Sequence, residues 1–166
     1  KTRNVTPITD DDYIAASQSP SGSGNLTLNG VGVTGGVALF YENLAEKKDP
    51  TAHLITITSG GNDTGRTFTI TGKDERGLSI TDAVTGASGA AATSAKYFSE
   101  VSNVAINGAS AGTVKVGVAG KCVSGWICFS LDSAASFKAG LSVCLTGTIN
   151  AKVRHCFDQT NSTSAF

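Results

Sequence analysis

The chain has 166 residues, the size of one domain whose core is large enough to fold without metal or disulfide support. Its 13 basic and 13 acidic residues give a net charge of zero, and the basic residues are scattered, which argues against a nucleic-acid partner. No apolar run approaches membrane-spanning length, so we expect no membrane partner. Only 16% of the residues are charged, and a surface with so few charges is suited to lying against other protein.

Residues 1–24 are predicted to be an extended N-terminal arm rather than part of the core. Proline at position 7 favours an extended chain, and residues 17–24 have the Ser- and Gly-rich composition of a flexible linker. An arm of this length reaches far enough to lie across a neighbouring subunit. Its apolar anchors are the candidate partner-binding residues, namely Pro7, Ile8, Tyr13 and Ile14.

A short acidic run, Asp10 to Asp12, lies within this predicted arm. Three adjacent carboxylates are potential calcium ligands. Calcium loops, however, take their ligands at regular alternate positions and end on a later bidentate acid, and neither feature is present. A solvated acidic cap or turn is therefore the favoured interpretation.

The segment 25–50 is predicted to begin with two strands. Residues 25–30 alternate apolar and polar side chains and end in Asn-Gly, and residues 31–40 form an apolar, glycine-interrupted stretch that we interpret as a second strand with a bulge. Residues 41–48 have the composition of a helical turn, which Asp49 and Pro50 would end.

Residues 53–118 are predicted to form an antiparallel meander. Short runs alternate Ile, Phe, Leu or Val with Thr or Ser, which is typical of strands with one dry face and one solvated face. Residues 59–65 and 73–77 supply the Gly, Asn and Asp that hairpin turns require.

The final third is predicted to add a Trp-led strand at 126–131 and a hairpin of two alternating runs at 137–145 and 149–157. His155 falls in phase with apolar neighbours, which indicates a core or edge histidine rather than a catalytic one. The predicted fold is all-β: an antiparallel β-sandwich, or a jelly-roll-like pair of sheets, of about nine or ten strands. It would span residues 25–158, with 159–166 as a flexible C-terminal tail.

Motifs that carry chemistry are missing from the sequence. It contains no dinucleotide fingerprint, no phosphate-binding loop, no zinc-protease motif and no nucleophile elbow, so we expect a protein that is not an enzyme and has no cofactor and no metal site. Convergence of carboxylates from remote strands, as in glycosidases, stays open. The four cysteines, which lack paired zinc-site spacing, are interpreted as buried thiols, with a disulfide as the alternative: Cys122, Cys128, Cys144 and Cys156.

Three segments resemble a family of small structural proteins of tailed phages. They are residues 53–72 (HLITITSGGNDTGRTFTITG), residues 95–98 (AKYF) with the following Val101, and residues 108–117 (GASAGTVKVG). The end of the chain matches more loosely, since Gln159 and Thr160 follow Asp158 where the family often has a doubled acid and a proline.

The resemblance implies a virion component, and we expect it on the capsid surface, and in the host cytoplasm during assembly. Within that class we favour a capsid decoration, or cement, protein that clamps neighbouring major capsid subunits and stabilises the head. Its expected partners are the major capsid protein and further copies of itself, as a homotrimer.

Two other functions remain open at this stage. A head-to-tail connector or tail structural protein would use the same sandwich in a ring. A carbohydrate-binding or adhesive module would need exposed aromatic side chains, for which the candidates are Tyr13, Tyr41 and Tyr97.

Overall fold

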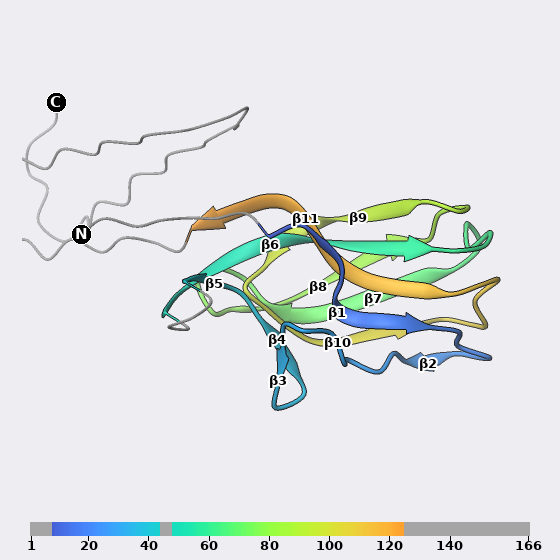
Figure 1. The fold of residues 1–166 in the computed structure, drawn as a ribbon, viewed down its shortest axis with the longest axis horizontal. Coiled ribbons are helices and arrows are strands. Elements are labelled where there is room, and N and C mark those ends of the chain that lie inside the picture. Colours follow the sequence, from blue (N-terminus) through green and yellow to red (C-terminus); the bar gives the residue numbers. More distant parts are fainter. Residues whose placement is uncertain (1–7, 44–47, 125–166) are drawn as a thin grey trace, which may run out of the picture. The chain divides into compact units, whose positions relative to one another are not determined.

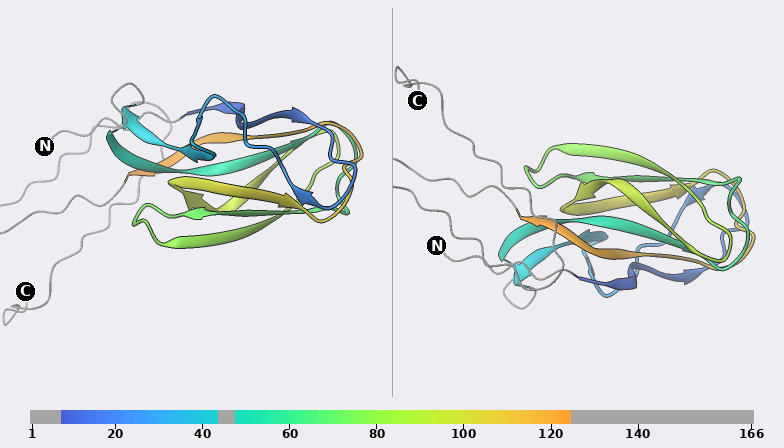
Figure 2. Two further views of the ribbon diagram at one scale, coloured as in Figure 1. Left: turned by 90° about the horizontal axis from the view of Figure 1, so that it is seen from below. Right: turned by 90° about the horizontal axis from the view of Figure 1, so that it is seen from above.

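The computed structural model describes residues 8–43 and 48–124, which form two antiparallel β-sheets packed face to face (Figure 1). Views from above and below show the two layers edge-on (Figure 2). The elements found in these residues are all strands. The prediction of an all-β antiparallel sandwich is confirmed.

The first sheet is built around its longest strand, β6. The order across it is β1–β11–β6, and the far side of β6 pairs with β5 near its start and with β9 along the rest of its length. The strands of this sheet are β1 (Asp10–Gln18), β5 (Tyr41–Asn43), β6 (Lys48–Ser59), β9 (Ala91–Phe98) and β11 (Val114–Ser124).

The second sheet has the order β3–β4–β10–β7–β8, and β2 pairs with the other end of β10. Two of its strands are only two residues long, so its β2–β4 side is made of short pieces. The strands of this sheet are β2 (Gly24–Asn25), β3 (Val33–Thr34), β4 (Val37–Leu39), β7 (Thr67–Lys73), β8 (Ser79–Thr85) and β10 (Glu100–Ile106).

The core lies between the sheets and is made by the alternate apolar residues that the sequence pattern assigned to the dry face. Side chains from β6, β7 and β11 meet there with little or no exposure, while Thr69 on the opposite face of β7 is exposed. Burial of each such aliphatic side chain stabilises the fold by about 1.5–3 kcal/mol. The predicted inward residues that are buried are Ile55, Ile57, Phe68, Ile70, Val84, Val114, Val116 and Val118.

The predicted meander is wrong in its connections. Only β7 and β8 are consecutive strands of that segment paired as a hairpin, through the turn at 73–77, where Gly77 has a φ of 79°. The connections β6–β7, β8–β9, β9–β10 and β10–β11 each cross from one sheet to the other. Alternation of side chains reports which face of a strand is dry, but not whether the next strand lies in the same sheet.

The predicted N-terminal arm is also wrong for residues 10–18. These residues form β1, which pairs antiparallel with β11, and Tyr13, Ile14 and Ala15 are buried in the core. The short core strand was missed because an acidic run precedes these apolar residues and a Ser- and Gly-rich run follows them, and both compositions are typical of exposed segments. Residues 19–23 then carry the chain from the first sheet to the second.

Two predictions for residues 31–48 are corrected as well. The stretch 31–40 is not one bulged strand but a hairpin of β3 and β4, turned by Gly35 and Gly36 at φ values of 62° and 83°. Residues 41–43 and 48 lie in β5 and β6, where a helical turn was predicted. Predictions for residues 125–166, including the final hairpin, His155 and the tail, fall outside the described residues.

Candidate contact surface

The two lateral sides of the sandwich differ in charge. No Asp, Glu, Lys or Arg occurs from Tyr13 to Tyr41. This stretch supplies β1 from Tyr13 onward and all of β2 to β4, which run together along one lateral side, drawn in blue, whereas β8 and β9 form the opposite side (Figures 1 and 2). We call the surface formed by residues 13–41 the neutral side.

Backbone hydrogen bonds hold the neutral side together. The outer edge of β1 is covered by residues 26–32, where Gly30 N donates to Ile14 O at 3.0 Å and Gly32 N donates to Tyr13 O at 2.9 Å. Glycine is required at position 32, because a Cβ there would overlap the Tyr13 ring.

Side-chain amides extend this cover toward the end of β1. Asn29 Oδ1 accepts a hydrogen bond from Ala16 N at 2.9 Å. The Gln18 amide bonds the backbone of Thr27 in both directions, each at 3.0 Å. The edge of β1 is thereby closed by groups that carry no charge.

The β3–β4 hairpin projects from the neutral side (Figure 1). Val31, at its base, is 81% exposed, while Val33 and Val37 are half-buried. Within the described residues, β3 ends its sheet and pairs only with β4. An exposed edge strand with apolar side chains and no charge is a template for contact with another protein chain.

The opposite side, at β8 and β9, is closed by charged side chains. Asp82 Oδ2 accepts hydrogen bonds from Ala95 N at 2.7 Å and from Lys96 N at 3.0 Å, and thus connects the two sheets. Lys96 Nζ in turn donates to Thr81 O at 2.6 Å. Charged side chains that hydrogen-bond to the backbone at a sheet edge block strand addition, so this side resists pairing with a strand of another chain.

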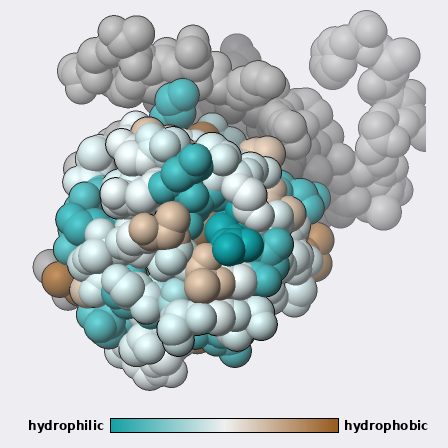
Figure 3. Space-filling model, turned by 90° about the vertical axis from the view of Figure 1, so that its right-hand side faces the viewer, coloured by the Kyte–Doolittle hydropathy of each residue, from teal (hydrophilic) through white to brown (hydrophobic). Residues whose placement is uncertain are grey.

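The loops at one end of the sandwich are tied to a buried carboxylate. Asp63, which is not exposed, accepts a hydrogen bond from Ala111 N at 2.7 Å and donates its backbone N–H to Ala87 O at 2.9 Å. Arg66 Nε donates to Ala109 O at 2.6 Å. The surface of this end is mostly of intermediate hydropathy, with scattered hydrophilic residues and a few hydrophobic ones (Figure 3).

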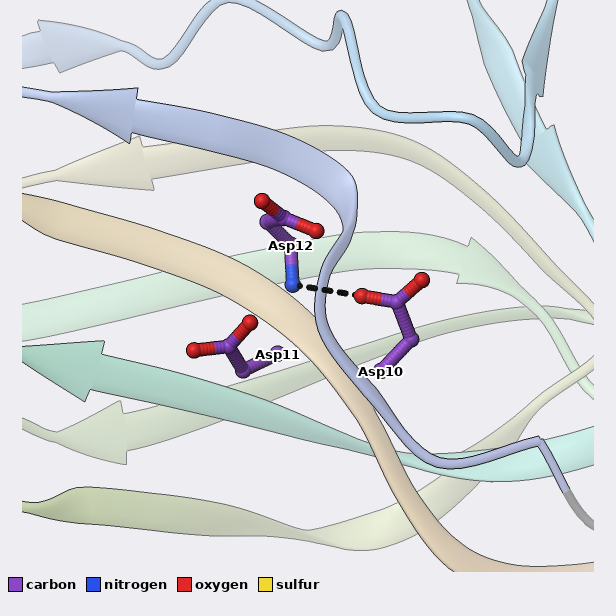
Figure 4. Close-up of side chains that lie close together, drawn as sticks. All are labelled: Asp10, Asp11 and Asp12. Atoms are coloured by element: carbon purple, nitrogen blue, oxygen red, sulfur yellow. Dashed lines mark hydrogen bonds between the residues drawn. The ribbon is translucent and has the colours of Figure 1, made fainter.

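The acidic run lies at the start of β1, with carboxylate oxygens within 4.8 Å of one another (Figure 4). Asp10 Oδ1 accepts a hydrogen bond from Asp12 N at 3.1 Å, and Lys115 Nζ forms an ion pair with Asp11 at 2.9 Å. Hydrogen bonding to Asp10 raises the pKa of Asp12. Within the part of the chain that the structure describes, these carboxylates are the residues most able to ligate a cation, but Lys115 already offsets part of their charge.

His53 is buried in the core of the first sheet. Its Nε2 lies 3.0 Å from Thr51 Oγ1, and its ring lies 5.1 Å from that of Phe40. Burial lowers the pKa of His53 to about 4, so the imidazole is neutral at pH 7. Cys122 lies opposite His53 in the β6–β11 ladder and is half-buried.

The candidate partner-binding residues predicted from the sequence are placed differently from that expectation. Tyr13 and Ile14 are buried in the core of their own domain, so their side chains do not present a partner surface. Ile8 packs against the same core and is partly buried, and Pro7 lies outside the described residues. The signal that sequence reasoning missed was the absence of charge across residues 13–41, which the sequence shows directly, although only the topology places these residues along one side of the sandwich.

Comparisons of the chain with protein-family models, with curated proteins and with solved structures find no match. Among the described residues, there is no helix with the length and apolarity needed to cross a membrane.

Proposed function

We propose that this chain is a non-enzymatic structural protein of a tailed-phage virion, most specifically a capsid decoration protein that clamps neighbouring major capsid subunits. The observation that carries the proposal is the neutral side, where an exposed valine and an open edge strand lie on a surface without charge. The resemblance of residues 53–72 and 108–117 to small phage structural proteins supplies the class of particle.

The physical role follows from where a shell is weakest. A head packed with DNA is under outward pressure, and a protein bound across a boundary between subunits adds buried area there. Each contact is small, so many copies must act together for the effect to be large. A folded β-sandwich suits this task because its backbone is already ordered and loses little conformational entropy on binding.

The contact is assigned to the folded domain rather than to a free arm, because β1 belongs to the core. Partners proposed for this chain are the major capsid protein and other copies of itself. The proposed location is the capsid surface, with assembly in the host cytoplasm.

Quantitative mass spectrometry of purified particles tests the proposal. A decoration protein is present in fixed high proportion to the major capsid protein, and electron microscopy places its density over subunit boundaries. Absence from the particles contradicts the function. Presence only in the low number of a ring at the neck or tail favours the connector or tail alternative.

An adhesive module has less support, because Tyr13 is buried and Tyr41 and Tyr97 are half-buried. A glycan array tests it directly, and specific retention of a glycan would replace the decoration proposal.

A further inference from the structure

We propose that the neutral side is the surface through which two copies of this chain associate, edge to edge, around a two-fold axis. This deepens the proposed function by naming a partner. It rests on that function only in taking the chain to work through protein contacts.

The first argument is electrostatic. A two-fold interface brings the same surface patch of both copies together, so a charge near the axis meets its own copy. Like charges that face each other in this way repel and make the free energy of association less favourable. Most charged surfaces therefore do not associate with their own copies. Residues 13–41 carry no charged side chain, so the side chains of this stretch meet their own copies without repulsion; the charges that precede it, Asp10 to Asp12, lie at the start of β1.

The second argument is the difference between the sheet edges. On the β8–β9 side, Asp82 and Lys96 occupy backbone groups and place charge at the edge. On the neutral side, β3 ends its sheet with an unpaired outer edge among the described strands. An antiparallel strand pair has local two-fold symmetry, so β3 of one copy pairs with β3 of the other in the same geometry.

The third argument is apolar burial. Val31 is 81% exposed beside this edge, and Val33 and Val37 are half-buried next to it. The edge pairing places these side chains against their copies and removes them from water. Each valine that becomes fully buried favours association by an amount comparable to its burial in a core.

The hairpin that presents these valines is held in place before binding. The Tyr13 ring stacks on Phe40 at 5.6 Å, and the Tyr13 hydroxyl donates to Leu39 O at 3.4 Å at the base of β4. Gly32 packs directly on the same ring. Less conformational entropy is lost on association when the binding element is already ordered.

The neutral side fits a second copy better than a charged partner. Recognition of a different, charged protein uses complementary charges to steer and select it, and residues 13–41 supply none. The two-fold contact gives pairs of chains, in contrast to the homotrimer expected of a decoration protein from the sequence, so the measured stoichiometry decides between them.

The test is sedimentation equilibrium of the full chain over a range of concentrations. The wild-type protein is expected to form dimers. Val31→Lys is expected to weaken the dimer about tenfold or more, because it opposes two buried ammonium groups. Its melting temperature is expected to equal that of the wild type at concentrations where both are monomeric, since Val31 is exposed in the single chain. Mixing Val31→Lys with Val31→Asp is expected to restore association, as opposite charges then face each other.

Leu78→Lys is the matched control. Among the described residues, Leu78 is the other large apolar residue with high exposure, at 56%, and it lies in the turn between β7 and β8. This variant is expected to dimerise like the wild type.

Several results overturn the inference: a wild-type monomer or trimer, a Val31→Lys chain that dimerises normally, a mixture that stays monomeric, or equal weakening by Leu78→Lys. A monomer that loses binding to emptied heads on Val31→Lys substitution would assign the neutral side to the capsid protein instead. If dimers form but purified particles lack the chain, the virion function fails and the dimer contact stands.

Discussion

At the scale of single residues, His53 links the stability of the sandwich to pH. Its pKa is about 4 when folded, against an ordinary value of 6.5, because burial disfavours the charged ring. Between these values the unfolded chain binds a proton that the folded chain does not. The contribution of the neutral His53 ring to the free energy of unfolding is therefore fully present above pH 6.5. It is lost as the pH falls toward 4, by about 3 kcal/mol in all.

Urea unfolding of wild type and His53→Gln at pH 7 and pH 4.5 measures this contribution. The stability advantage of wild type over the variant is expected to shrink as the pH falls. The variant corrects for carboxylates that titrate in the same range. Parallel pH profiles for the two proteins would show that His53 is not the group responsible.

Gly72 illustrates a residue fixed by close backbone approach. A Cβ at this position on β7 would overlap the carbonyl oxygen of Glu100 on β10. Gly72→Ala is expected to destabilise the protein by about 1–3 kcal/mol, because the two strands must separate. Gly22→Ala is the control, since nothing lies within 4 Å of its Cβ position. Thermal unfolding of both variants checks the prediction, and equal melting temperatures would contradict it.

At the scale of elements, β1 decides whether the N-terminus is an arm or part of the fold. Deleting residues 1–18 removes Tyr13, Ile14 and Ala15 from the core and exposes the β11 edge with Val116. The truncated chain is expected to be unfolded or molten by circular dichroism, whereas an arm would be dispensable. A cooperative transition near the wild-type temperature would restore the arm interpretation.

Asp11→Asn is the matched control for this deletion. It removes only the partly exposed ion pair between Asp11 on β1 and Lys115 on β11. Such pairs contribute about 0–1 kcal/mol, so the melting temperature is expected to change little.

The limits of prediction from sequence are clearest among the strands. Ile55, Ile57 and Ile70 were assigned to the dry face correctly, because alternation is a property of each strand alone. The sheet in which a strand lies depends on long-range pairing, such as β1 with β11, which no local pattern encodes. The neutral side was readable as a run of uncharged residues, but its place along one side of the sandwich required the topology.

At the scale of the whole molecule, the few charges are unevenly distributed: residues 13–41 carry none, while charged residues precede them on β1 and occur on β7 to β11. The zero net charge of the chain arises from groups outside residues 13–41, and those described at β8 and β9 close the other side of the sandwich. The domain therefore has one side suited to contact and one side that resists it. This segregation is compatible with a defined assembly rather than with unlimited aggregation.

The salt dependence of self-association follows from this segregation. Salt screens interactions between exposed charges and leaves apolar and backbone contacts nearly unaffected. Association through the neutral side is therefore expected to change by no more than about twofold in dissociation constant between low and high sodium chloride, since no charged pair forms across it. Sedimentation equilibrium at both salt concentrations measures this. A steep loss of dimer with salt would place the contact on charged groups, such as Asp82 and Lys96, instead of on the neutral side.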